Sequence, residues 1–191
     1  MSEGAPLIVG LGGTTRPGSS TERALAAALG AAEALGARTR LVGGDFLADL
    51  PIYDPRPGDP TPRQAEMAEI IRSADGLIIA TPGYHGSLSG VMKNALDTLE
   101  LLRDDTRPYF SERAVGVIVT SAGLQAAGTT LTAVRSIIHA MRGWPTPFGA
   151  AISVNSDSFG PDGRPLEPRD AWQLDTVAAQ VVQFARMRFT S

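Results

Sequence analysis

The stretch that decides the fold is Leu7-Ile8-Val9-Gly10-Leu11-Gly12-Gly13-Thr14-Thr15-Arg16-Pro17-Gly18-Ser19-Ser20-Thr21. Residues 6–11 form a continuous apolar run, which is typical of a parallel strand covered on both faces. The run stops at Gly12-Gly13, and a loop of hydroxyl residues follows. Apolar residues at helical spacing come next, at Leu25, Ala28, Leu29 and Ala32. The stretch therefore predicts a strand, a glycine-rich loop and a helix, the first half of a βαβ unit.

The same alternation of apolar runs and helical patterns recurs along the chain. Further strands are predicted at residues 38–42, 76–81, 114–120 and 148–154. A helix is predicted to begin at Thr61-Pro62, whereas residues 43–61 carry repeated Gly, Asp and Pro and predict a long irregular connection. The alternation predicts a single α/β domain over residues 1–191, built on a doubly wound parallel sheet. With strand order 2-1-3-4-5, the loops after strands one, three and four would share one edge.

Composition narrows the class of protein. The chain has 191 residues, of which 43% are apolar and 19% charged, as in a globular domain. It has no cysteine, so disulfides, thiolate chemistry and Cys-ligated metals are excluded. A net charge of −3 gives no attraction to nucleic acid or anionic membrane. No His/Asp/Glu cluster has metal-ligand spacing, and no signal peptide or apolar span is present, so we expect a cytoplasmic protein without a metal.

The first loop has the chemistry of an anion cradle. Its glycines allow close backbone approach, its hydroxyls donate hydrogen bonds, and the start of the helix supplies unpaired N–H groups. The side chains expected to bind are Thr14, Arg16, Ser19, Ser20 and Thr21. Plain helix capping is the alternative, but capping needs one hydroxyl rather than five with an arginine. The loop lacks Gly-Lys-Ser/Thr, and Thr15 replaces the third glycine of a dinucleotide fingerprint, which favours a terminal monophosphate.

Three segments in order resemble the NAD(P)H-dependent FMN reductases, a family that includes azo-, quinone- and chromate-reducing relatives. They are residues 13–21, Leu50-Pro51-Ile52-Tyr53-Asp54, and the most specific one, Pro82-Gly83-Tyr84-His85-Gly86-Ser87-Leu88-Ser89-Gly90-Val91-Met92-Lys93-Asn94-Ala95-Leu96-Asp97. The chain departs from the family at Thr14, usually serine, and at His85, often asparagine. The resemblance implies a flavodoxin-like three-layer sandwich with a five-stranded parallel sheet of order 2-1-3-4-5.

The resemblance also implies an FMN site made of three loops. Arg16, Ser19 and Thr21 resemble the family's phosphate-binding positions. The loop expected against the flavin ring is Pro82, Gly83, Tyr84, His85 and Gly86. Ser121, Ala122 and Gly123 resemble the loop that flanks the ring on its other side. Alternatively, Tyr84 and His85 belong to an ordinary turn in which one aromatic side chain packs on the core.

The implied function is an NAD(P)H-dependent flavin oxidoreductase. A hydride would pass from NADPH or NADH to FMN and then to a small-molecule acceptor, with reduced FMN supplied to a partner monooxygenase. The cofactor carries this chemistry, so no protein acid or base is expected to be catalytic. One alternative is a quinone or azo reductase with tightly bound FMN, and another is a flavodoxin-like electron carrier without enzymatic activity.

Several remaining polar and aromatic residues have open roles. Lys93, Asn94 and Asp97 are interpreted as solvated or capping residues, and His139 as structural. The segment 103–112, which includes Tyr109 and Phe110, could form an apolar surface with Trp144 and Trp172, or these aromatics could fill the core. The resemblance implies a homodimer or homotetramer.

Overall fold

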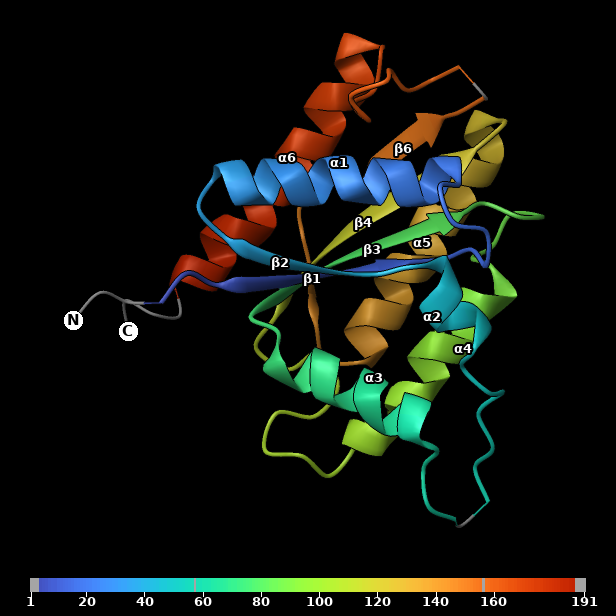
Figure 1. The fold of residues 1–191 in the computed structure, drawn as a ribbon, viewed down its shortest axis with the longest axis vertical. Helices are drawn as coiled ribbons and strands as arrows, with labels where there is room; N and C mark the ends of the chain where they lie inside the picture. Colours follow the sequence, from blue (N-terminus) through green and yellow to red (C-terminus); the bar gives the residue numbers. More distant parts are fainter. Residues whose placement is uncertain (1–3, 57, 156, 188–191) are drawn as a thin grey trace.

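A single parallel sheet forms the centre of the computed structural model, which describes residues 4–56, 58–155 and 157–187 (Figure 1). Its strands are β1 (Leu7–Gly12), β2 (Arg38–Val42), β3 (Gly76–Pro82), β4 (Ala114–Ser121), β5 (Trp144–Pro145) and β6 (Ala150–Ser153). The order is β2-β1-β3-β4-β5, and β6 also pairs with β4. All the pairs are parallel, so the predicted fold class and strand order are confirmed.

The fifth strand differs from its prediction as one strand over 148–154. The edge of the sheet is split: β5 pairs with Ala114 and Val115, whereas β6 pairs further along β4, at residues 118–121. Pro145 and Pro147 have no backbone N–H to donate to a ladder, which explains why the strand breaks between them and Ala150.

Helices cover both faces of the sheet. α1 (Ser20–Ala34) and α6 (Pro168–Met187) lie on one face, and α3 (Pro62–Ser73), α4 (Gly90–Thr98) and α5 (Leu124–Ala140) on the other (Figure 1). Alternate strand residues feed the two cores, so that Ile8 packs with α1 and α6 while Val9 packs on the opposite face. This arrangement is the three-layer sandwich. In the described part of the chain, no helix is long and apolar enough to cross a membrane.

The connection predicted as irregular over 43–61 contains a short helix, α2 (Gly44–Ala48). Its buried Leu47 joins the core, and the Glu22 side chain accepts a hydrogen bond from Gly44 N at 3.0 Å. α3 begins as predicted, with a capping box between Thr61 and Gln64. α4 begins at Gly90, because Ser89 caps it, and a 3-10 turn, η1 (Leu99–Leu102), follows it.

The aromatic residues are divided between core and surface. Phe110 is fully buried and Tyr109 is half-buried, so the segment 103–112 does not form one surface with the tryptophans. Trp144, in β5, is 60% exposed, and Trp172, in α6, is 57% exposed. Of the two alternatives, filling the core is correct for Phe110, because this side chain packs near Gly143 and Ile138.

The strand register brings three loops to one edge of the sheet. Gly12 of β1 lies opposite Ala80 of β3, and Pro82 lies opposite Thr120 of β4. The segments that follow β1, β3 and β4 therefore leave the sheet side by side, as the strand order predicted.

Candidate functional site

The loop after β1 is held by its own hydroxyl groups. Ser19 is the N-cap of α1 and accepts a hydrogen bond from Glu22 N at 3.3 Å. The hydroxyls of Thr14 and Ser19 lie 2.8 Å apart and share a hydrogen bond. The capping alternative is thus correct for Ser19, and the same side chain also lines a cavity. Capping and ligand binding are compatible here, because a hydroxyl oxygen has acceptor and donor capacity.

Glu22 fastens this loop to the start of α2. One carboxylate oxygen accepts from Gly18 N at 3.2 Å, and the other accepts from Gly44 N at 3.0 Å. Gly18 has φ +67°, a left-handed conformation that favours glycine. A Cβ built on Gly44 would lie 3.0 Å from the carbonyl carbon of Thr15, so α2 approaches the loop closely. The loop conformation is therefore fixed from both sides before any ligand binds.

Arg16 differs from most basic side chains of the protein. Its guanidinium is exposed and, within the described part of the chain, makes no hydrogen bond, ion pair or ring contact. By contrast, Arg23 donates to two backbone carbonyls and Lys93 pairs with Asp97 at 2.7 Å. An exposed cation beside a fixed loop is available to an anionic ligand.

A cavity of about 560 Å³ lies beside Arg16. It is lined by Gly13, Thr14, Thr15, Arg16, Ser19, Tyr84, Ser89, Gly90 and Val91. Among them, Ser19 is the N-cap of α1, and Ser89, Gly90 and Val91 are the N-cap and first residues of α4; the first-turn N–H groups of a helix have no partner within their own helix. Two helix N-termini and one arginine meeting at one cavity make an electropositive site for an anion.

Ser89 joins the loops after β1 and β3. Its hydroxyl donates a short hydrogen bond to Gly13 O and accepts from Met92 N, which caps α4. Its own N–H donates to the Thr81 hydroxyl at 3.1 Å. A Cβ on Gly13 would lie 2.9 Å from Ala80 O, so only glycine fits at this junction. The floor of the cavity is consequently backbone, which a ligand can approach closely.

The loop after β3 is a tight turn over residues 84–87. Ser87 N donates to Tyr84 O at 3.0 Å, while His85 and Gly86 have φ +51° and +79°. These values are those of a type I′ turn, whose central positions favour Gly, Asn and Asp. Histidine is among the residues that tolerate this conformation. Tyr84 is 58% exposed and lines the cavity, whereas its neighbours Pro82 and Gly83 continue the sheet edge.

The loop after β4 is shorter and more open. The Ser121 hydroxyl donates to Gly123 O at 2.7 Å, and Ala122 and Gly123 are exposed. None of the three lines the 560 Å³ cavity. They lie at the same edge of the sheet, next to the turn after β3, because Pro82 pairs with Thr120.

Of the residues predicted to bind the cofactor, Thr14, Arg16, Ser19 and Tyr84 line the cavity. The Thr21 hydroxyl is buried and shares a hydrogen bond with the Thr120 hydroxyl at 2.6 Å. Ser20 lies in the first turn of α1 without lining the cavity. Their binding roles remain predictions.

Ser89 and Glu22 were not among the predicted site residues. The spacing Ser19-x-x-Glu22 is that of a capping box, which could have drawn attention to Glu22. Its carboxylate does not return to Ser19 N, however, but reaches Gly18 and Gly44. Ser89 precedes an apolar helical pattern, the signal of an N-cap.

The polar residues of α4 have structural roles. Lys93 and Asp97 form an exposed ion pair, and the Asn94 side chain accepts from Tyr53 N and donates to Pro51 O. No group of three His, Asp or Glu side chains could hold a metal ion in the part of the chain that the structure describes.

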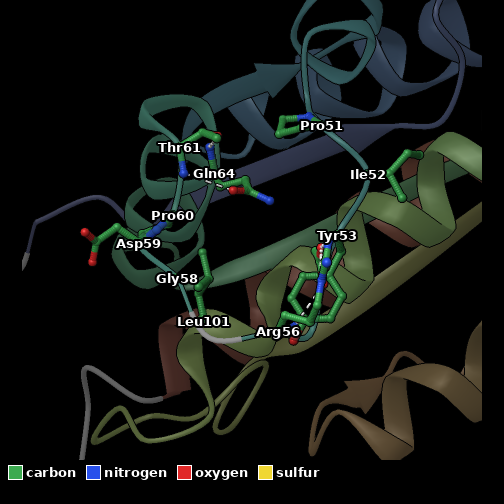
Figure 2. A pocket seen from close by; sticks show the side chains of 11 residues that line it. Pro51, Ile52, Tyr53, Arg56, Gly58, Asp59, Pro60, Thr61, Gln64 and Leu101 are labelled. Carbon is green, nitrogen blue, oxygen red and sulfur yellow. Dashed lines mark hydrogen bonds and ion pairs between the residues drawn. The ribbon is translucent and has the colours of Figure 1, made fainter.

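A second cavity, of about 430 Å³, lies between residues 51–54, 56 and 58–60 of one loop, the start of α3 and Leu101 (Figure 2). Its loop carries an ion pair in which the Arg56 guanidinium holds the pKa of the Asp54 carboxyl below its usual value. Both partners are engaged with each other and neither lies at the sheet edge of the first cavity. We therefore assign the ligand site to the cavity beside Arg16.

Comparisons with known proteins show the family to which the chain belongs. The family model for NADPH-dependent FMN reductase matches residues 6–157. The FMN-dependent NADPH-azoreductase of Staphylococcus aureus is 35% identical over 98 residues, 51% of this chain and 48% of that protein. The match thus spans about half the length of this curated relative.

Solved structures share the fold. The flavoenzyme NAD(P)H:(acceptor) oxidoreductase FerB from Paracoccus denitrificans has a TM-score of 0.78 at 19% identity, over 96% of this chain and 98% of that one. The apo form of an NADH:FMN oxidoreductase, EMOB, has a TM-score of 0.70 at 22% identity, over 96% and 90%. Since the family model covers most of the chain, including all three loops, the chain belongs to the NADPH-dependent FMN reductase family.

Proposed function

We propose that this protein binds FMN with the phosphate in the cavity beside Arg16, and that it is an NAD(P)H-dependent flavin oxidoreductase. The observation that carries the proposal is the Arg16 guanidinium, which has no partner in the described structure and lines the same cavity as Ser19 and Ser89, the N-caps of α1 and α4. A cavity of about 560 Å³ is within the range of small-molecule sites, roughly 300–1,000 Å³.

The residues present fit a monophosphate group. Arg16 supplies a planar pair of donors, Thr14 and Ser19 supply hydroxyls, and the first turn of α1 supplies N–H groups. The Glu22 carboxylate does not occupy the Arg16 guanidinium, because its oxygens accept from Gly18 N and Gly44 N instead. Riboflavin, which lacks the phosphate, would leave this half of the site unused.

The ring would lie toward the turn after β3. Tyr84 walls the cavity on that side, and an aromatic side chain can pack against a flat ring. The open loop 121–123 leaves the opposite side accessible to a nicotinamide or an acceptor. When bound, FMN supplies the hydride and electron transfer between NADPH or NADH and the acceptor. The protein's part is to hold, orient and partly cover it.

The second part of the proposal concerns the molecule that accepts electrons from reduced FMN. We favour a reductase that supplies reduced FMN to a flavin-dependent monooxygenase. A quinone or azo reductase that retains FMN is the second candidate, supported by the similarity to the FMN-dependent NADPH-azoreductase of Staphylococcus aureus. A non-enzymatic electron carrier is the third, and it would have no pyridine-nucleotide activity.

One set of assays on the purified protein tests the proposal. We expect NADH or NADPH oxidation that depends on added FMN and is weaker with riboflavin. FMN that passes freely through a dialysis membrane would support supply to a partner, whereas FMN retained through dialysis, with turnover of a benzoquinone or an azo dye, would support the second candidate. The absence of both flavin binding and pyridine-nucleotide oxidation would contradict the proposal.

A further inference from the structure

The turn after β3 and the glycine before it rest on α5. A Cβ built on Gly83 would lie 3.2 Å from the carbonyl oxygen of Ala126 and 3.2 Å from the hydroxyl oxygen of Thr130. One built on Gly86 would lie 3.3 Å from the Thr129 hydroxyl oxygen. These separations are shorter than ordinary van der Waals contact, so glycine lets the backbone come down onto the helix. The turn that we place beside the flavin ring is therefore supported by hydroxyl residues of α5.

The hydroxyl groups of α5 are of two kinds. Thr129, Thr132 and Ser136 donate to backbone carbonyls three or four residues back in the same helix. The Thr130 side chain is fully buried, and its hydroxyl makes no hydrogen bond in the described structure. The carbonyl four residues before it, Ala126 O, accepts from the Thr129 hydroxyl at 3.2 Å instead. Thr130 is thus a buried polar side chain that the helix itself does not satisfy.

The turn after β3 is the polar neighbour from which a partner for Thr130 can come. A buried hydroxyl without a partner costs free energy, because it has lost its bonds to water and gained none. On the same face of α5, the residues one turn away, Ala127 and Val134, are apolar and buried in the core. They offer no hydrogen bond. Gly83 leads into a turn whose residues Tyr84 and His85 are exposed, so its backbone has room to adjust.

We propose that Thr130 is a positioning residue for the flavin ring, an inference that rests on the proposed function. When the ring binds, the turn after β3 settles on α5 and the Thr130 hydroxyl donates to the carbonyl of Gly83. Gly83 N already donates to Thr120 O at 2.8 Å, so the carbonyl is the group of this residue that is left for the hydroxyl. Thr130 does not line the 560 Å³ cavity and would act on the flavin through the turn.

The hydrogen bond would orient a donor of the turn. The C=O and N–H groups of a trans peptide point in opposite directions, and the described chain has no cis peptide. Holding the Gly83 carbonyl toward α5 would therefore direct the Tyr84 N–H away from the helix, where it is available to a ligand. Thr130 would in this way fix a backbone donor without touching the ligand itself.

Fluorescence titration with FMN and with riboflavin tests this proposal. Thr130→Val keeps the shape of the side chain and removes the hydroxyl, and it should raise the Kd for both flavins equally, by about 3- to 10-fold, as expected for one neutral hydrogen bond. The two losses should be equal because the turn faces the ring and not the phosphate. Thr130→Ser keeps the hydroxyl and should stay within about twofold of the wild type. The matched control is Thr132→Val on the same helix, whose hydroxyl is bonded to Gly128 O, and it should bind like the wild type.

Chemical denaturation without flavin separates positioning from a merely structural role. Thr130→Val should be at least as stable as the wild type, because its hydroxyl has no partner to lose. A less stable Thr130→Val, unchanged binding of both flavins, or a loss in Thr130→Ser as large as that in Thr130→Val would overturn the inference and leave the proposed function intact. A wild type that binds neither flavin would contradict the proposed function and this inference together.

Discussion

The loops after β1 and β4 lie near the same edge of the sheet but are built differently. The loop after β1 is tied down by Glu22, Ser89 and the shared hydrogen bond between Thr14 and Ser19. In the loop after β4, the side-chain bond that the described structure shows runs from Ser121 to Gly123, backbone bonds join Ser121 to Val154 and Gly123 to Ala127, and Ala122 and Gly123 are exposed. In the proposed complex, the protein would therefore hold the phosphate of FMN in a fixed loop and leave the flavin ring accessible.

This difference separates two properties of the proposed enzyme. A rigid anion cradle sets which cofactor binds, because its donors are already in place and cost little ordering entropy. On the side of the flavin ring, the exposed loop 121–123 places few limits on which molecules can approach the cofactor. We therefore expect strict discrimination among flavins and loose discrimination among acceptors.

Arg16→Ala should give the largest change in flavin binding. Losing a hydrogen bond to a charged group costs about 1.5–3 kcal/mol, so the Kd for FMN should rise about 10- to 100-fold. The Kd for riboflavin should change less than about twofold, since it has no phosphate. Fluorescence titration with both flavins measures this, and Arg169→Ala, an exposed arginine at the start of α6, is the control. Equal losses for the two flavins would mean that Arg16 does not contact the phosphate.

Glu22→Ala should have the next largest effect, about 10-fold on the Kd for FMN. It removes the carboxylate that holds Gly18 and Gly44, so the cradle must be ordered at the moment of binding. Glu33→Ala, further along α1, removes a carboxylate bonded to the Thr39 hydroxyl and should leave the Kd unchanged. An unchanged Kd for Glu22→Ala would show that the loop keeps its shape without the clamp.

These two residues show what the sequence reveals about this site. The sequence draws attention to Arg16, because this arginine lies in a glycine- and hydroxyl-rich loop before a helix, and the structure places it beside a cavity; its role in binding stays a prediction. The clamp by Glu22 could not be predicted, because it depends on α2, a five-residue helix in a stretch rich in turn-forming residues. The split of the fifth strand was hidden for a similar reason. The pattern from Phe148 to Val154 is strand-like, while the pairing of Trp144 depends on the position of β4.

Thr21→Val should lower stability, and its effect on flavin binding tests whether the Thr21 hydroxyl is also a phosphate ligand. It removes the buried hydrogen bond to Thr120, which costs about 1–3 kcal/mol in the free energy of unfolding. Thr130→Val is the control: its hydroxyl is buried and has no hydrogen-bond partner in the described structure, so the change should be neutral or stabilising. Chemical denaturation measures both variants. A selective loss of FMN binding in Thr21→Val would instead make its hydroxyl a phosphate ligand.

His85→Asn should have the smallest effect. Asparagine adopts the left-handed conformation of this turn position readily, so stability and turnover should stay within about twofold of wild type. His85→Val should be less stable, because a β-branched residue is strained at φ +51°. Steady-state NADPH oxidation measures turnover, and a large fall for His85→Asn would assign a chemical role to the imidazole.

A crystal structure of the protein with FMN tests the proposed cradle most directly. We expect a phosphate oxygen within hydrogen-bond distance of the Arg16 guanidinium and of backbone N–H groups at the start of α1. We also expect the ring to lie on the side of Tyr84, between the turn 84–87 and the loop 121–123. A phosphate bound elsewhere, for example in the second cavity beside Leu101, would contradict the proposed phosphate site beside Arg16.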